Sequence, residues 1–297
     1  MKLLWLVLKK KIFIFIGFIL ITFNAFGQGV NNLWLLGYNS ITDINTTSIR
    51  ATLDFQSGAL NIIPTNSKMR FDETEGNIAD NNGNLLMSSN GIWIADATGD
   101  TMMNGNNLNP GPFASNFKKY GLPLPYGNLF LPWPGDTSKF VLFHMVGNLS
   151  LSATLAATEL YYSLIDHNLA GGLGGVTLKN QIVFQDTLTW GIGACKHANG
   201  RDWWIVTIKD NSNELVKVLL TPNGISSITA QTIATLNSYP GNNCQPVFSP
   251  DGKKFAFSTG HVVGASIVDE INYFDFDRCT GMFSDHQKLN TTDGSTT

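Results

Sequence analysis

The chain has 297 residues, of which 43% are hydrophobic and only 14% are charged. Soluble domains carry about 25% charged residues on average, so these numbers exclude a disordered chain and a coiled coil. The 29 glycines do not follow the strict repeat of a collagen, and together with 19 phenylalanines they indicate a folded, aromatic-rich β protein.

The N-terminus has the pattern of an export signal. A basic run, Lys9–Lys11, precedes a mostly apolar segment from Ile12 to Phe26. This segment is shorter than the about 20 residues that a membrane-spanning helix needs. We therefore expect residues 1–27 to be a signal peptide, cleaved between Gly27 and Gln28. An uncleaved anchor is the alternative, because further apolar residues precede the lysines.

The exported part of the chain is acidic. The first 27 residues hold four of the 19 basic residues and no acid, which leaves 15 basic residues against 22 acidic ones, a net charge of −7. Such a chain is a poor partner for nucleic acid or for an anionic membrane. We expect an extracellular or cell-surface protein with an extracellular ligand, either a polysaccharide or a protein, and with no membrane span after cleavage.

Three cysteines, Cys195, Cys244 and Cys279, remain after cleavage, and the sequence leaves their pairing open. Cys195 and His197 point to one face of an extended strand and could bind a metal with a third ligand, but no third ligand is obvious nearby. We expect Cys195 to be a buried thiol and His197 to bind turn backbone together with Asn199. The sequence predicts no metal site and no cofactor.

Four segments of the chain repeat one pattern, in which a strand with small residues leads into a glycine-containing turn and an apolar strand follows. The turn glycines are Gly83, Gly135, Gly200 and Gly252, at intervals of 52, 65 and 52 residues. Asn-Gly and Asp-Gly turns are strong hairpin signals. A third apolar strand and a weaker fourth one come next, and four strands in about 50 residues are typical of a β-propeller blade.

The repeats place blades near residues 74–115, 124–187, 188–238 and 240–297, within a propeller that spans 28–297. Residues 28–73 are also β-rich and could supply an outer strand that completes the last blade of a closed ring. The expected fold is therefore an all-β propeller of four-stranded blades with little helix. We expect a C-terminally truncated ring of six or seven blades; a five-bladed ring and a β-sandwich are the alternatives.

The first strand of each blade should lie nearest the axis, where only small residues fit, and the aromatic residues should pack between blades. One end of the axis then offers a ligand funnel, for which Glu75, Asn128 and Gln245 are the candidates. A binding or adhesion module is the favoured function. The alternative is a propeller-type carbohydrate-active enzyme, a lyase or glycosidase with two carboxylates facing one cleft. No catalytic residues are predicted, because the chain has no Gly-x-Ser-x-Gly elbow and nothing selects a triad.

Several segments resemble the N-terminal propeller of large proteins exported by the type IX secretion system. They include Asp80–Leu86, His197–Trp204, Phe248–Gly252 and Phe274–Gly281. The Ser-Pro-Asp-Gly unit within the third segment occurs in many propellers, whereas the second and fourth segments are more specific. The resemblance covers nearly all of residues 34–297 and implies a secreted or surface-exposed propeller, the N-terminal part of a larger cargo protein, with an unknown ligand. It transfers no catalytic residues.

Overall fold

The computed structural model describes residues 32–37, 50–65, 67–148, 157–236, 245–263 and 266–291. Within these ranges strands are the main regular structure, with one short α-helix, α2 (Pro112–Phe117), and one 3-10 turn, η2 (Leu169–Gly172). The prediction of an all-β protein with little helix is confirmed. No helix in the described ranges is long and apolar enough to cross a membrane. The predicted cleavage site, Gly27 and Gln28, lies outside the described residues.

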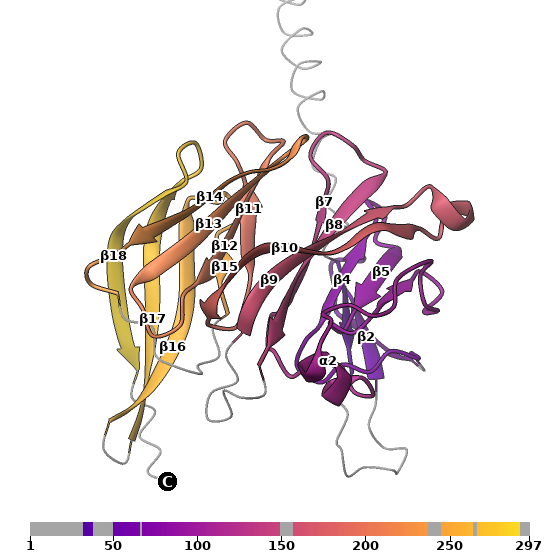
Figure 1. Cartoon of the computed structure of the whole chain (residues 1–297), viewed down its shortest axis with the longest axis horizontal. Coiled ribbons are helices and arrows are strands. Elements are labelled where there is room, and N and C mark those ends of the chain that lie inside the picture. The colour runs from indigo at the N-terminus through magenta and orange to yellow at the C-terminus, as the bar shows by residue number, and fades with distance from the viewer. Residues whose placement is uncertain are drawn as a thin grey trace, which may run out of the picture.

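Five antiparallel sheets follow one another along the chain, and in each sheet the strands pair in sequence order. Figure 1 shows the sheets side by side, from the N-terminal sheet on the right to the C-terminal sheet on the left. Their strands are β1 (Leu33–Leu36), β2 (Arg50–Asp54) and β3 (Asn61–Thr65); β4 (Gly76–Ala79), β5 (Leu85–Ser89) and β6 (Ile94–Asp96); β7 (Asn128–Pro132), β8 (Lys139–Gly147), β9 (Ala157–Asp166) and β10 (Gly175–Leu188); β11 (Gly193–Lys196), β12 (Trp203–Ile208), β13 (Glu214–Thr221) and β14 (Gly224–Thr232); and β15 (Val247–Phe248), β16 (Lys254–Val263), β17 (Ser266–Asp277) and β18 (Met282–Thr291).

The first strands of neighbouring sheets lie against one another, as in propeller blades. Strand β4 contacts both β1 and β7, and β11 contacts β15. A Cβ added to Gly76 would lie 3.0 Å from the Cβ of Asn128, and one added to Gly193 would lie 3.1 Å from the carbonyl oxygen of Pro246. The first strands therefore carry small residues because they approach one another closely.

The turn glycines have the predicted backbone. The φ angles of Gly83, Gly135, Gly200 and Gly252 are 82°, 77°, 73° and 69°, which is the left-handed region that favours glycine. Each of these glycines lies between the first and second strands of its sheet.

The N-terminal strands β1, β2 and β3 pair with one another and form a sheet of their own, and the outer strand of the fifth sheet is β18. That residues 28–73 complete the last blade of a closed ring stays a prediction. The second sheet, β4–β6, has three strands rather than four in the described ranges.

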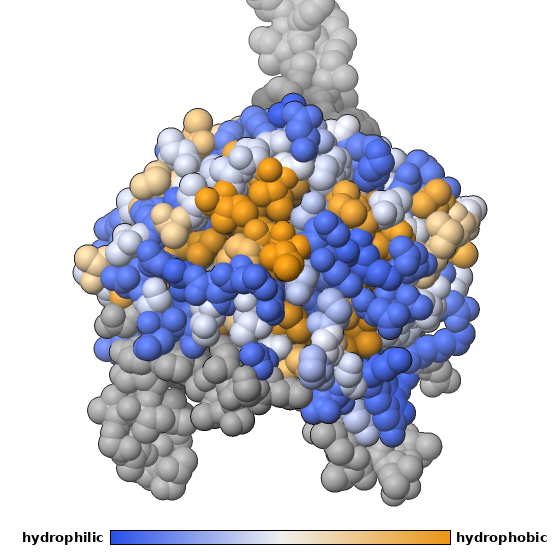
Figure 2. All heavy atoms as spheres, in the orientation of Figure 1, coloured by the Kyte–Doolittle hydropathy of each residue, from blue (hydrophilic) through white to orange (hydrophobic). Residues whose placement is uncertain are grey.

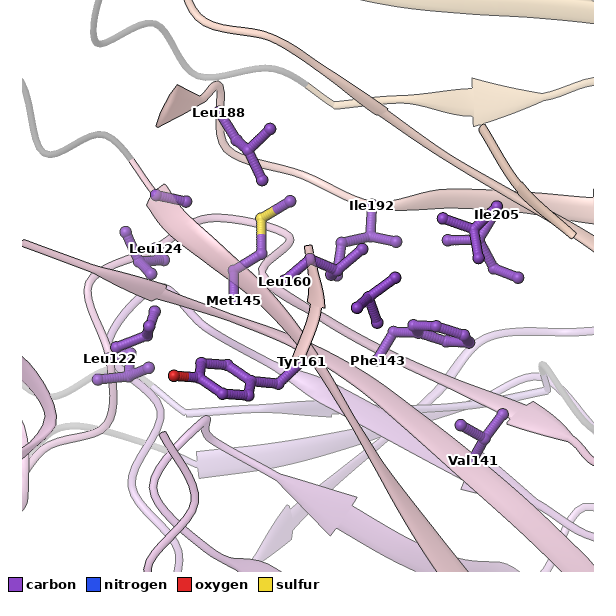
Figure 3. Close-up of a cluster of buried hydrophobic side chains, with 14 of the residues drawn as sticks. Leu122, Leu124, Val141, Phe143, Met145, Leu160, Tyr161, Leu188, Ile192 and Ile205 are labelled. Carbon is purple, nitrogen blue, oxygen red and sulfur yellow. The ribbon is translucent and has the colours of Figure 1, made fainter. Parts of the chain in front are cut away.

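The largest apolar cluster fills the space between the third and fourth sheets (Figure 3). It includes Phe143, Met145 and Leu160 of the third sheet and Ile205 of the fourth, all at most 1% exposed. A second cluster joins the fourth and fifth sheets, where Phe257 and Phe274 stack with ring centroids 5.9 Å apart. Aromatic side chains therefore pack between blades as predicted, because large rings bury the most area there.

A fully buried histidine, His144 on β8, links the second and third sheets. Its Nδ1 lies 2.6 Å from the Oδ1 of Asn109, and its Nε2 lies 2.9 Å from the Oγ of Ser163. The ring stacks on Tyr161, with centroids 5.6 Å apart. Burial lowers the pKa of His144 to about 3, so the ring is neutral at physiological pH.

The outer strands of the third and fourth sheets leave apolar side chains at the surface. Ile182 on β10 is 52% exposed and Ile228 on β14 is 43% exposed. Figure 2 shows apolar atoms gathered in the middle of the viewed face, where these two strands lie in Figure 1.

Candidate functional site

A cavity of about 470 Å³ lies along the first strands of the second, third and fourth sheets. This volume falls within the roughly 300–1,000 Å³ of typical ligand pockets. Its walls come from β4, β7 and β11, with one ring from β12. The lining residues are Gly76, Asn77, Ile78, Asn81, Asn128, Leu129, Phe130, Leu131, Pro132, Ala194, Lys196 and Trp203.

Asn128 is the buried polar group of this wall, with 7% of its surface exposed. Its Nδ2 donates hydrogen bonds to the carbonyl oxygen and the Oγ of Ser89, at 3.0 and 3.1 Å. Its Oδ1 is buried and has no hydrogen-bond partner among the described residues. An unsatisfied buried acceptor costs about 1–3 kcal/mol, so a donor at this position would stabilise the wall.

Asn77, a second amide of the lining, has a structural role. Its Nδ2 donates to the carbonyl oxygen of Leu33 at 2.8 Å, and its Oδ1 accepts from the backbone N–H of Leu35 at 3.4 Å. Both groups therefore join β4 to β1.

The charged group of the lining is the ammonium of Lys196. Its Nζ lies 3.8 Å from the centroid of the Trp203 ring and donates to the carbonyl oxygen of Arg201 at 3.0 Å. The ring is itself held, because its Nε1 donates to the carbonyl oxygen of Pro132 at 2.9 Å. Burial lowers the pKa of Lys196, and the nearby Asp202 partly opposes this shift. The ammonium is thus a fixed, half-buried cation.

A second cavity, of about 310 Å³, shares Ile78, Asn81 and Pro132 with the first. Its lining adds His167, whose Nδ1 is buried without a hydrogen-bond partner in the described ranges. It also adds Asp80, whose carboxylate accepts hydrogen bonds from the backbone of its own turn and from the amide of Asn84, which together lower its pKa. The two cavities are neighbours and share one wall.

The structure brings one of the three predicted funnel residues to the main cavity. Asn128 lines it, whereas Glu75 and Gln245 do not belong to its lining. Glu75 is half-buried just before β4, and burial raises its pKa to about 7. Gln245 is exposed ahead of β15.

Sequence reasoning missed Lys196 and Trp203. The available signal was a lysine in a first strand that is otherwise built from small residues, Gly193–Lys196. Trp203 was predicted to pack between blades, which it does in part while it also holds the lysine.

His197 binds turn backbone, as predicted. Its Nε2 lies 3.0 Å from the carbonyl oxygen of Cys279, and its Nδ1 accepts from the backbone N–H of Asn199 at 3.1 Å. Cys195 is 7% exposed, and burial raises the pKa of its thiol to about 12, which confirms the buried thiol. Both Cys195 and Cys279 are free thiols, and Cys244 lies outside the described residues. In the described ranges no three His, Cys, Asp or Glu side chains group as a metal site.

The segments His197–Trp204 and Phe274–Gly281 contact each other between the fourth and fifth sheets. The carbonyl oxygen of Arg278 accepts from the backbone N–H of Ala198 at 3.0 Å and from the Nε1 of Trp204 at 2.9 Å. A Cβ on Gly281 would lie 2.7 Å from the Trp204 ring. We call this contact the interblade clasp; it joins neighbouring sheets.

No family model and no curated protein matches the chain. Among solved structures, the chain is similar to the periplasmic gluconolactonase PpgL of Pseudomonas aeruginosa, at 14% identity over 82% of this chain and 63% of that one, with a TM-score of 0.42. It is also similar to a functionally unknown protein from Desulfotomaculum acetoxidans (10% identity, 82% and 64% coverage, TM-score 0.37) and to TolB from Acinetobacter baumannii (14%, 82% and 48%, TM-score 0.33).

The chain therefore spans less than two thirds of the length of these structures. Its own sheet order defines the class, an all-β protein with propeller-like blades.

Proposed function

We propose that this chain is an exported β-propeller module, secreted or displayed at the cell surface, that binds an extracellular ligand in the cavity between β4, β7 and β11. The observation that carries the proposal is the wall of this cavity, where the buried amide of Asn128 and the fixed ammonium of Lys196 meet an apolar strand. A few polar groups on an apolar wall are typical of ligand sites.

The alternative function, a carbohydrate-active lyase or glycosidase, requires two carboxylates that face one cleft. The cavity wall offers amides, apolar side chains and one cation, which suit recognition through hydrogen bonds and stacking. A binding module is therefore the better match to this site.

We further propose that the module belongs to a six- or seven-bladed ring in a larger cargo protein of the type IX secretion system. The first sheet supports the ring. Trp34, Leu53 and Ile62 lie in register across β1–β3 and share one face. Trp34 and Ile62 are 53% and 59% exposed on that face. Apolar faces cover one another between the other sheets, so a further blade would bury this one.

The binding site is tested by filling the cavity. Ala194→Phe adds a ring to a lining residue, and Ala230→Phe on the exposed strand β14 is the matched control. Both variants and the parent are titrated with a panel of extracellular polysaccharides and envelope proteins, by calorimetry. We expect Ala194→Phe to lose at least about tenfold in affinity and Ala230→Phe to bind normally. Unchanged binding by Ala194→Phe would refute the site.

Export is tested separately. The full gene is expressed in its native host, and the N-terminus of the extracellular protein is sequenced by mass spectrometry. A mature chain that begins at Gln28 supports the signal peptide, and a chain that retains residues 1–27 contradicts it. Loss of the extracellular protein when type IX secretion is disabled supports the proposed route.

A further inference from the structure

We infer that the ligand of this cavity is a saccharide that carries a carboxylate, bound through the ammonium of Lys196. This inference rests on the proposed function and specifies the chemistry of the same site.

The first step is the charge of Lys196. In the described ranges no carboxylate lies within ion-pair distance of its Nζ. The nearest candidate, Asp202, is occupied: its Oδ1 accepts from the Nε of Arg201 at 2.8 Å and its Oδ2 accepts from the Nδ2 of Asn199 at 2.8 Å. A half-buried cation without a counter-ion favours an anion in the cavity that it faces.

The second step is that the ammonium is held in place. The Trp203 ring supports it on one side, and the ring is anchored to the backbone of β7 at Pro132. One of the three N–H donors of Lys196 points to the carbonyl oxygen of Arg201 and the Trp203 ring covers a second direction, so at least one donor remains for a ligand. A donor held in this way gives more affinity than a free surface lysine, because less side-chain entropy is lost on binding.

The third step separates a saccharide from an acidic peptide. The walls also hold a neutral hydrogen-bonding group, the exposed amide of Asn81, which lines both cavities. Hydroxyl groups both donate and accept, so a sugar ring can pair with both ends of this amide. Two adjoining cavities of about 470 and 310 Å³ also suit an oligosaccharide with a sugar in each. A uronate oligomer combines these hydroxyls with a carboxylate.

The test compares charged and neutral forms of one backbone. The folded chain is titrated with oligogalacturonate, with its fully methyl-esterified form, with oligomers of glucuronate and mannuronate, and with polyglutamate. We expect at least one uronate to bind and its methyl ester to bind at least about tenfold more weakly, since a charged hydrogen bond is lost. Polyglutamate should bind more weakly than the uronate.

Variants locate the effect at the lysine. Lys196→Met keeps most of the stem and should weaken uronate binding about tenfold, with little effect on the methyl ester. Lys196→Arg keeps the charge and should retain most of the affinity. Lys253→Met, at an exposed turn position, changes the net charge equally and should bind like the parent. The comparison of the uronate with its methyl ester uses only the parent protein, so it tests the need for a carboxylate even if Lys196→Met does not fold.

Three outcomes would overturn the inference: equal binding of the uronate and its ester, no binding of any uronate, or binding of polyglutamate in preference to the uronates. In each case the proposed function stands if another ligand binds the parent protein and the Ala194→Phe variant no longer binds that ligand. If ligands bind but Ala194→Phe has no effect, the proposed site fails as well.

Discussion

The pH dependence of folding should reveal two groups whose pKa values are shifted in opposite directions by burial, His144 and Glu75. Burial lowers the pKa of His144 to about 3 and raises the pKa of Glu75 to about 7. Their ordinary values are 6.5 and 4.5. The substitutions His144→Gln and Glu75→Gln remove each titratable group while they keep hydrogen-bonding capacity.

The sign for His144 follows from proton binding. Below pH 6.5 the unfolded chain binds a proton that the folded ring does not, so the free energy of unfolding falls from pH 6.5 down to about 3. For Glu75 the folded carboxyl holds its proton longer, so its contribution is complete below pH 4.5 and is lost as the pH rises to about 7. Each group changes the free energy of unfolding by at most about 1.4 kcal/mol per pH unit in its window.

Between pH 4.5 and 6.5 the two slopes oppose each other, so the parent protein should show a flat profile there. Glu75→Gln should expose the histidine slope, a loss of roughly 1–3 kcal/mol from pH 6.5 to 4.5. His144→Gln should show the reverse slope, on top of a constant loss from its altered hydrogen bonds. Urea unfolding at half-unit pH steps measures both. Parallel pH profiles for the parent and both variants would refute the reasoning.

Three further substitutions test the packing, each by urea unfolding against the parent. Phe257→Ala removes a fully buried ring from the cluster between the fourth and fifth sheets and should cost about 3–5 kcal/mol, and a cost under 1 kcal/mol would contradict this packing. Gly200→Ala places a Cβ in open space at a φ of 73°, so it should cost about 1–2 kcal/mol from backbone strain alone. Gly76→Ala places a Cβ 3.0 Å from Asn128 and should cost about 1–3 kcal/mol, so a neutral effect would mean that β4 and β7 are further apart.

The sequence predicts best what depends on neighbouring residues. A glycine with positive φ leaves a local signal, so Gly83, Gly135, Gly200 and Gly252 marked the hairpins of four sheets correctly. The same kind of signal was present at Gly58, whose φ of 77° turns the chain between β2 and β3. Residues 28–73 were predicted to be β-rich, and their strands β1–β3 form a sheet of their own.

The candidate site depends on contacts between sheets, and such contacts leave weaker signals in the sequence than a turn glycine does. Asn128 was predicted correctly as a site residue because it is the first residue of β7, and the first strands of the sheets lie close to one another. Glu75 and Gln245 occupy comparable positions in the sequence, but the cavity extends along β7 towards Pro132 instead of around the strand starts. The pairing of Lys196 with Trp203 bridges a turn and its anchor is 71 residues away, so no local pattern reveals it.

Substitutions of the adjacent residues Trp203 and Trp204 should have separable effects on stability and on ligand affinity. Both Nε1 groups donate 2.9 Å hydrogen bonds to a backbone oxygen, from Trp203 to Pro132 and from Trp204 to Arg278. Replacing either by Phe should cost about 1 kcal/mol of stability, because one hydrogen bond is lost. Trp203→Phe should also weaken binding of the uronate probe several-fold, since the ring under Lys196 loses its anchor to Pro132 and is a weaker cation–π partner.

Trp204→Phe should leave the affinity for that probe unchanged, because its ring belongs to the interblade clasp. Denaturant unfolding and calorimetric titration of the same two preparations measure both effects. Equal losses of affinity in the two variants would mean that the clasp and the cavity are one mechanical unit. The division expected here means that the clasp mainly determines how neighbouring sheets join, while the ligand is recognised by side chains beside it.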